Sequence, residues 1–353
     1  MFQTSFSYDA LPMRVRFGSG SLASLPDEVD RLGARRALVL CSPRRPGEGR
    51  AVADALGDRA AGVLAEARMH VPVEVARRAR DEAARLGADC CVAVGGGSAI
   101  GLGKAVALEH GLPVVAVPTT YSGSEMTPGW GLTENGRKRT GSDARVLPKS
   151  VLYDPDLTFD LPVEVSVTSG FNAVAHAVEA LYAPDRSPLT SLMAVEGVRA
   201  MAGALPGVAA DGADLDARTR ALYASWLCGA CLAGTTTGLH HKVCHALGGT
   251  LDLPHAPTHT VVLPYALAYN RGSAPEAVEA LSRALDSADP ARRLHDLAGS
   301  LGAPRSLREL GMAEGDIEPI AAQVVDARPA NPAPLTLDGV TRLLRAAWSG
   351  EAP

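Results

Sequence analysis

Cysteine, positive charge and long apolar runs are all scarce in this sequence, and each scarcity excludes a class of protein. Six cysteines among 353 residues do not suggest a disulfide framework. A net charge of −5 at pH 7 gives no basic surface for nucleic acid. No apolar run reaches the roughly 18–20 residues of a membrane span, and the first residues lack the pattern of a secretory signal. The sequence therefore predicts a cytoplasmic globular protein.

One pair of cysteines, Cys228 and Cys231, has the C-x-x-C spacing of a metal or redox motif. The pair lies in an apolar segment with helical periodicity, and no second C-x-x-C completes a zinc knuckle. We expect both to be buried, reduced thiols.

Strand and helix patterns alternate in the first part of the chain and give way to helices alone in the second. The expected strands lie at residues 13–17, 37–41, 60–64, 90–94 and 113–117, and the helices between them at 24–32, 49–56, 73–86 and 105–109. Such alternation predicts a parallel sheet with helices on both faces. The later helices are expected at 163–182, 189–202, 216–233, 242–247, 275–285, 290–301, 307–310 and 337–348. We therefore predict an α/β domain at 1–155, an all-α domain at 156–353, and a ligand site in the cleft between them.

A glycine-rich turn follows the expected strand at 90–94. Gly95, Gly96 and Gly97 let an anion approach the main chain, and Ser98 is placed to cap the following helix. The turn matches neither G-x-G-x-x-G nor a Walker loop. A second loop rich in hydroxyls follows the next strand, and two such loops side by side suit a dinucleotide. The candidate cofactor residues are Ser42, Gly95, Gly96, Gly97, Ser98, Lys104, Thr119, Thr120, Ser122 and Ser124.

The choice between NADH and NADPH stays open. An acid at the end of an early strand usually binds the ribose of NADH. Here Cys41-Ser42-Pro43 ends that strand, and Arg44-Arg45 follows.

Five of the nine histidines fall between residues 239 and 259. His241 and His245 are four apart, so a helix projects both rings from one face. The Gly248-Gly249 pair is expected to end this helix, and the chain then returns His255 towards the same face. Such a cluster is typical of a metal site or an acid/base site.

With these motifs the chain resembles the iron-containing alcohol dehydrogenase superfamily, and within it the maleylacetate reductases. The similarity covers nearly the whole chain. It rests on the motifs Leu11-Pro-Met-Arg14, His70-Val-Pro-Val-Glu74, Gly95-Gly-Gly-Ser98, Ile100-Gly-Leu-Gly-Lys104, Pro118-Thr-Thr-Tyr-Ser-Gly-Ser-Glu-Met-Thr127, Arg145-Val-Leu-Pro148, Ser169-Gly-Phe-Asn-Ala-Val-Ala-His-Ala-Val-Glu179 and Leu239-His-His-Lys-Val-Cys-His245. The resemblance implies an α/β N-terminal dinucleotide-binding domain plus an all-α C-terminal domain (dehydroquinate synthase-like / iron-containing alcohol dehydrogenase fold), in a homodimer. It also implies reduction of the C=C bond of maleylacetate, a dicarboxylate, to 3-oxoadipate with NADH or NADPH, late in aromatic compound degradation.

The resemblance also identifies the positions at which metal-dependent relatives bind an ion with one Asp and three His. They correspond here to Asn172, His176, His241 and His255. Asn172 lacks the carboxylate, and losing one negative charge weakens binding of a divalent ion. His176, His241 and His255 could still hold zinc, but the resemblance favours a metal-free site.

The chemistry of the implied substrate points the same way. An enone with two carboxylates is electron-poor at the carbon beta to its ketone, so hydride addition gives an enolate that hydrogen-bond donors can stabilise. We hypothesise that His241 and His245 supply the donor and the general acid, with His176, His255 and Asn172 in the same pocket. Lys242 either holds a substrate carboxylate or is a solvated surface lysine. Arg137 and Lys138, expected in a loop, are further candidates.

Several positions depart from what the resemblance leads us to expect near the cofactor: Pro128-Gly-Trp130, Thr235-Thr-Thr-Gly238 and Tyr265. These departures leave open a reductase of a related unsaturated or keto acid in a biosynthetic pathway, or a metal-dependent alcohol dehydrogenase. A lyase of the dehydroquinate synthase type would need the carboxylate that Asn172 lacks. A non-catalytic nucleotide-binding protein would not explain the clustered histidines.

Overall fold

The computed structural model describes residues 6–11, 13–134 and 137–353, with the side chains of residues 137 and 138 excepted. The described residues form two compact units: one within residues 10–161, and the other comprising residues 162–353 together with residues 6–9.

The first unit is built on a six-stranded sheet in which all neighbouring strands are parallel, in the order β1-β8-β5-β4-β2-β3. The strands are β1 (Arg14–Phe17), β2 (Ala37–Leu40), β3 (Ala60–Leu64), β4 (Cys90–Gly95), β5 (Val114–Pro118) and β8 (Ser150–Tyr153). The expected parallel sheet is confirmed. Strand β8 is missing from the expectation because four buried residues give too little pattern to separate a strand from a loop.

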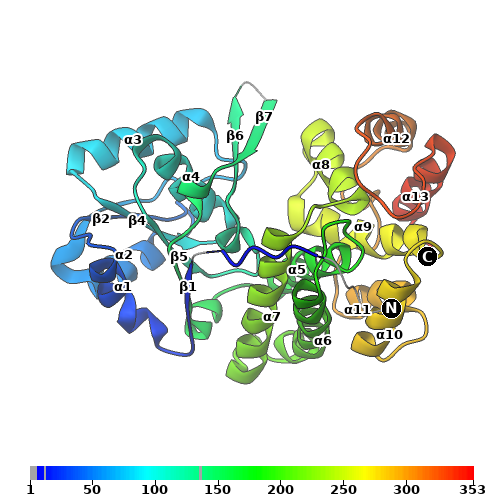
Figure 1. The fold of residues 1–353 in the computed structure, drawn as a ribbon, viewed down its shortest axis with the longest axis horizontal. Helices are drawn as coiled ribbons and strands as arrows, with labels where there is room; N and C mark the ends of the chain where they lie inside the picture. Colours follow the sequence, from blue (N-terminus) through cyan, green and yellow to red (C-terminus); the bar gives the residue numbers. More distant parts are fainter. Residues whose placement is uncertain (1–5, 12, 135–136) are drawn as a thin grey trace. The chain divides into compact units, whose positions relative to one another are not determined.

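Helices cover both faces of this sheet, as Figure 1 shows. They are α1 (Leu25–Arg31), α2 (Pro46–Leu56), α3 (Val73–Leu86) and α4 (Gly97–His110). One face carries alternate strand residues such as Val39, Val92 and Val115, which pack with Val29 of α1 and Val52 of α2. The residues of the inner strands β2, β4, β5 and β8 are buried on both faces, which explains the continuous apolar runs at β2, β4 and β5 in the sequence.

A separate antiparallel hairpin of β6 (Gly129–Glu134) and β7 (Arg137–Ser142) follows the hydroxyl-rich loop. The sequence signal for it, Asn135-Gly136, is typical of a two-residue hairpin connection. The hairpin corrects the expectation of a loop at Arg137 and Lys138, which begin β7. The side chains of these two residues lie outside the described part of the chain.

The second unit is entirely helical in its regular structure. Its longer helices are α5 (Val163–Ala180), α6 (Pro188–Ala210), α7 (Leu215–Gly234), α8 (Leu239–Leu251), α9 (His255–Asn270), α10 (Pro275–Leu285), α11 (Pro290–Ser300), α12 (Ile317–Asp326) and α13 (Leu337–Ser349). Helix α5 is buried along almost its whole length because α6, α7 and α9 pack around it. The expected all-α character is confirmed.

Helix α6 contains an 18-residue window with a mean hydropathy of 1.2, which is long and apolar enough to cross a membrane by length and composition alone. This corrects the expectation that no such run exists. The helix begins at a capping box formed by Ser187 and Thr190 and packs against α5 and α7. One such helix is weak evidence for a span, because core helices of globular proteins share these properties.

Three expectations in this unit are wrong. Helix α8 does not end at Gly248-Gly249 but runs to Leu251, because Leu247 and Leu251 pack into the core and offset the cost of two glycines. Helices α9 and α12 are missing from the expectation; in α9, Pro257 and Pro264 interrupt the helical sequence pattern. Residues 307–310 form turns rather than a helix.

Candidate active site

In the first unit, an uncapped helix N-terminus stands at the carboxyl end of β4. Helix α4 begins at Gly97, its N-cap is Gly96, and no side chain caps it, so Ser98 is not the cap that the sequence suggested. A Cβ at Gly96 would lie 2.9 Å from Thr120 Oγ1, and Gly95 has a φ of +134°. Only glycine fits these two positions, which leaves main-chain N–H groups open to an anion.

The loop after β5 lies beside this turn, since the Thr119 N–H donates to the Gly95 carbonyl at 3.1 Å. Ser42 lies two residues after the end of β2, the strand that pairs with β4, and its Oγ accepts from the Arg44 N–H at 3.2 Å. Strand β2 has β3 on one side and β4 on the other, so the strand order reverses here. A doubly wound sheet binds its ligand at such a point.

Lys104 holds this loop in place instead of offering a free charge. Its buried Nζ donates to the Ser124 carbonyl at 2.7 Å, the Gly129 carbonyl at 2.8 Å and Thr127 Oγ1 at 3.0 Å. Burial lowers the pKa of Lys104 to about 7. The three donors of Lys104 Nζ are thus used within the protein, and direct binding of the cofactor by Lys104 stays a prediction.

Glu125 stabilises the same loop through buried hydrogen bonds. It is fully buried, and it accepts from Tyr153 OH at 2.9 Å and from Ser122 Oγ at 3.1 Å. Burial raises the pKa of Glu125. Sequence reasoning missed Glu125, although it closes the Ser122-Gly-Ser-Glu125 motif.

In the second unit, the helices α5, α8 and α9 bring the predicted histidines together. The His241 ring centroid lies 4.9 Å from that of His176, 6.0 Å from that of His245 and 5.1 Å from that of His259. The His255 and His259 ring centroids lie 4.3 Å apart, with the ring planes tilted by 55°. The rings of His176 and His241 are buried, whereas His245 and His255 are exposed.

A chain of short hydrogen bonds runs through the buried part of this cluster. His241 Nδ1 lies 2.6 Å from Glu179 Oε2, and His241 Nε2 lies 2.8 Å from His176 Nδ1. An ionised carboxylate only accepts, so His241 donates from Nδ1 and its Nε2 accepts from His176. Glu179 thereby fixes the tautomer of both rings.

Glu179 also anchors the start of α8. It accepts from the Gly238 N–H at 2.8 Å and from the His240 N–H at 2.7 Å. A carboxylate at a helix N-terminus satisfies donors that the helix leaves unpaired. Sequence reasoning missed Glu179, although it stands three residues after His176 on one face of α5.

The other predicted residues are placed around these rings. Asn172 lies one turn before His176 and is buried, and its Oδ1 has no hydrogen-bond partner among the described residues. Lys242 is half-buried on α8.

The positions used by metal-dependent relatives do not fit an ion well. Within the described part of the chain, His176, His241 and His255 do not form a group with all ligand atoms within 4.8 Å of one another. The set also lacks an anionic ligand, because Asn172 is an amide.

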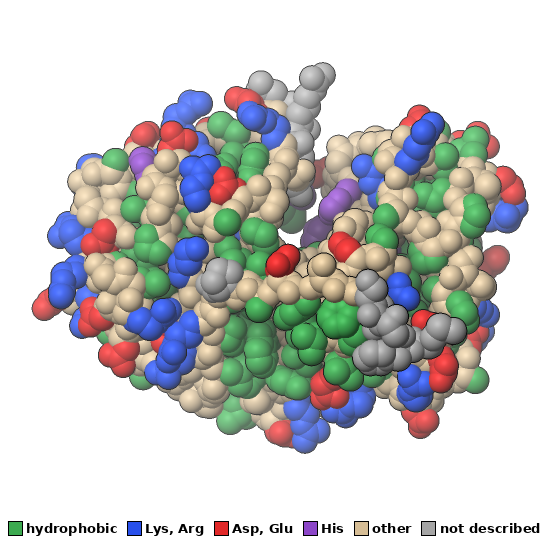
Figure 2. Space-filling model, viewed as in Figure 1, with side chains coloured by type: hydrophobic (Ala, Val, Ile, Leu, Met, Phe, Trp, Pro, Cys, Tyr) green, Lys and Arg blue, Asp and Glu red, His purple; other side chains and the backbone are tan. Residues whose placement is uncertain are grey.

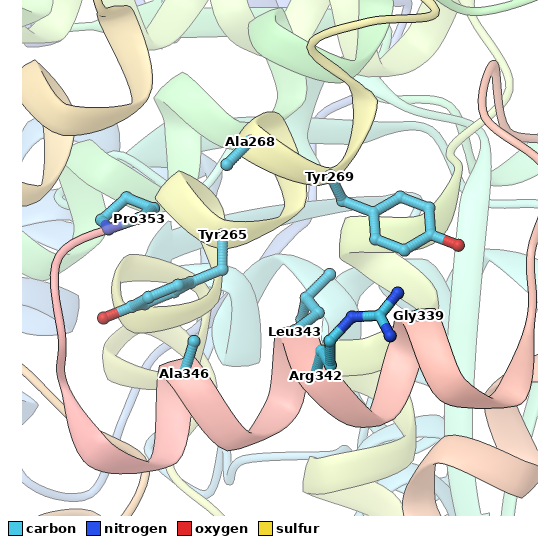
Figure 3. Close-up of a pocket in the computed structure, with 8 residues that line it drawn as sticks. All are labelled: Tyr265, Ala268, Tyr269, Gly339, Arg342, Leu343, Ala346 and Pro353. Atoms are coloured by element: carbon cyan, nitrogen blue, oxygen red, sulfur yellow. The ribbon is translucent and has the colours of Figure 1, made fainter.

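Tyr265 lies away from the cluster. Figure 3 shows it between α9 and α13, in a cavity of about 230 Å³ that Leu343 and Ala346 also line. Its ring neighbour is His295, at 6.2 Å between centroids. Tyr265 therefore gives no information about the substrate of the histidine cluster.

Acid should unfold the protein partly through His240 and His259. Burial lowers the pKa of both rings well below 6.5. Below pH 6.5 the unfolded chain binds protons that the folded chain does not, so stability falls with pH by up to about 1.4 kcal/mol per pH unit for each ring. Denaturant unfolding between pH 7 and pH 5 measures this slope. His259→Asn should reduce it by one ring's share, while His110→Gln, outside the cluster, should not; equal slopes in both variants would contradict the assignment.

Comparisons with known proteins agree with this architecture. Residues 12–155 match the iron-containing alcohol dehydrogenase family, and residues 166–348 match its C-terminal domain. The chain is 53% identical to the maleylacetate reductases of Burkholderia cepacia and Sphingobium indicum, over 99% of each chain. The crystal structure of maleylacetate reductase from Agrobacterium tumefaciens is similar with a TM-score of 0.96 and 47% identity, over 99% of this chain and 100% of that one. The chain therefore belongs to the iron-containing alcohol dehydrogenase family, and within it to the maleylacetate reductases.

Proposed function

We propose that the protein uses NADH or NADPH to reduce the C=C bond of maleylacetate to 3-oxoadipate, and that the reaction needs no metal. The observation that carries this proposal is the buried chain Glu179–His241–His176 in a protein about half identical to maleylacetate reductases. When bound, NAD(P)H supplies the hydride that the carbon beta to the ketone accepts. The protein must then stabilise the substrate enolate and deliver a proton to the neighbouring carbon.

The hydrogen-bonded pair of His176 and His241 is suited to deliver that proton. Glu179 stabilises a positive charge on His241, so the pair can hold an additional proton and release it towards the substrate. Asn172, with its unpaired oxygen, is a candidate hydrogen-bond partner of the substrate. The exposed rings of His245 and His255 and the ammonium of Lys242 are candidates for the two substrate carboxylates.

The cofactor should bind where β2, β4 and β5 end. Gly95, Gly96, Gly97 and Ser98 would hold the pyrophosphate with main-chain N–H groups. Thr119 and Thr120 are candidates for further contacts, together with Ser42, while Ser122 and Ser124 act through the loop that Lys104 and Glu125 support.

Arg44 is our candidate for binding the 2′-phosphate of NADPH. Arg44 is exposed beside Ser42. Arg45, in contrast, donates hydrogen bonds to Glu48 Oε1 at 3.0 Å and to the Asp160 carbonyl. Arg44→Ala should raise KM for NADPH by roughly 10- to 100-fold, the loss of a charged hydrogen bond, and leave KM for NADH nearly unchanged. The matched control is Arg77→Ala on α3. An equal change for both cofactors would remove Arg44 from this role.

Nicotinamide absorbance with purified protein tests the proposed reaction. Oxidation of NADH or NADPH should depend on maleylacetate and yield 3-oxoadipate. Turnover of simple ketones or aldehydes in place of maleylacetate would favour a metal-dependent alcohol dehydrogenase. Turnover of another unsaturated or keto acid only would favour a biosynthetic reductase.

We further propose that the protein works in the cytoplasm as a homodimer. Leu189 and Leu192 on α6 and Leu215 on α7 are large apolar side chains exposed in the single chain. Figure 2 shows acidic and basic side chains interspersed over the face that it draws, which does not favour nucleic acid as a partner. Light scattering of the purified protein should give the mass of two chains, and a monomer would refute this assembly.

A further inference from the structure

A second group of potential ligands lies behind the predicted active-site rings. His240 and Cys244 are one turn apart on α8, and His259 faces them from α9. His240 Nε2 lies 3.0 Å from His259 Nδ1, and Cys244 Sγ lies 3.7 Å from His240 Nε2. All three side chains are buried, and their ligand atoms lie within 4.8 Å of one another.

These separations are close to those around a zinc ion. Bond lengths of about 2.0–2.1 Å to nitrogen and 2.3 Å to sulfur, at tetrahedral angles, place two nitrogens roughly 3.3 Å apart and nitrogen and sulfur roughly 3.6 Å apart. Shifts of a few tenths of an ångström bring the observed atoms to these values. We propose that His240 Nε2, Cys244 Sγ and His259 Nδ1 bind one Zn²⁺ ion.

The protonation of the two imidazoles allows this. A facing nitrogen can bind a metal only if the ring carries its proton on the other nitrogen. The other nitrogens, His240 Nδ1 and His259 Nε2, have no partner among the described residues, so no protein group forces a different tautomer.

The thiol must lose its proton to bind the ion. Burial and the charge of Glu179 raise the pKa of Cys244, so the free thiol is protonated. Zn²⁺ replaces that proton, one proton is released for each ion, and the S–Zn bond forms without oxidation or reduction. The thiolate and the nearby carboxylate of Glu179 together balance the two positive charges.

This site is distinct from the positions that metal-dependent relatives use, because it contains none of Asn172, His176, His241 and His255. It would join α8 to α9 directly beside His241. The ion is therefore structural in our account: it holds the helix that carries His241 and takes no part in hydride or proton transfer.

Cobalt substitution tests the site with a readout independent of activity. The protein is produced in cells grown with Co²⁺, so that the ion meets the chain while it folds, and is purified anaerobically. We expect one Co²⁺ per chain and a thiolate-to-cobalt charge-transfer absorption. Protein from cells grown with Zn²⁺ in place of Co²⁺ should lack that absorption, and Zn²⁺ present while metal-free protein refolds in weak buffer should release one proton per ion.

Two variants and one control decide the ligands. Cys244→Ala should lose the charge-transfer absorption and the proton release, whereas Cys228→Ala, another buried cysteine on α7, should keep both. His259→Asn retains the thiol and should bind the ion roughly 100-fold more weakly. Protein without cobalt, cobalt without the charge-transfer absorption, or the absorption unchanged in Cys244→Ala or His259→Asn would each overturn the proposal. Circular dichroism should show that each variant is folded before its metal binding is measured.

Discussion

Replacing His241 with Gln should lower kcat for maleylacetate by a factor of about 10² to 10⁴, the usual contribution of a positioned proton donor. His241 is the middle member of the chain Glu179–His241–His176, so its loss separates His176 from the carboxylate. The affinity for NAD(P)H should stay near that of the wild type, because the cofactor loops belong to the other unit.

Steady-state turnover and cofactor titration, measured separately, check this prediction. His110→Gln is the matched control, since His110 lies at the end of α4 outside the cluster. Normal turnover of the His241 variant would remove this ring from the mechanism. The same assay on His245→Gln distinguishes a shared acid role for His245 from a role limited to binding the substrate.

Glu179→Gln should lower kcat by about 10²- to 10³-fold although Glu179 need not touch the substrate. The amide nitrogen of Gln donates, so only one side-chain oxygen remains to accept from His241 Nδ1 and from the Gly238 and His240 N–H groups. If the nitrogen faces His241, the ring must carry its proton on Nε2 and can no longer accept from His176. If the oxygen faces His241, the His240 N–H loses its acceptor. The pH profile of kcat should shift, because the charge that stabilises a protonated ring is lost.

A merely structural role for Glu179 would give a different result. Loss of its bonds to the Gly238 and His240 N–H groups alone would reduce stability, by about 1.5–3 kcal/mol, without moving the pH profile. Glu179→Asp keeps the charge and should restore part of the turnover. An unchanged pH profile with normal kcat in Glu179→Gln would refute its positioning role.

The inner part of the sheet could be predicted from the sequence because β2, β4 and β5 are buried on both faces and read as continuous apolar runs. Val92 and Val117 are examples, each followed by a polar or glycine-rich loop. What escaped prediction depended on tertiary contacts. Strand β8 is defined by its neighbours β1 and β5, and α8 continues through two glycines because Leu251 packs into the core.

The histidine cluster could be predicted from helical spacing, and the structure brings His176, His241, His245 and His255 into one group. Which ring of the cluster contacts which could not be predicted, because those contacts depend on how α5, α8 and α9 pack against one another. Glu179 was visible in the sequence only as a carboxylate one turn from His176. His259 lies at the centre of the cluster, yet α9 was not expected to be a helix.

The most direct test of the central claim is the rate of NAD(P)H oxidation with maleylacetate after exhaustive treatment with a chelator. It should be measured on the wild type and on Cys244→Ala, which lacks the proposed zinc ligand, so that a structural ion cannot be mistaken for a catalytic one. We predict that the chelator leaves kcat of Cys244→Ala unchanged and that added Fe²⁺ or Zn²⁺ does not increase it. Loss of activity in both proteins, restored by either ion, would contradict a metal-free reduction driven by Glu179, His241 and His176.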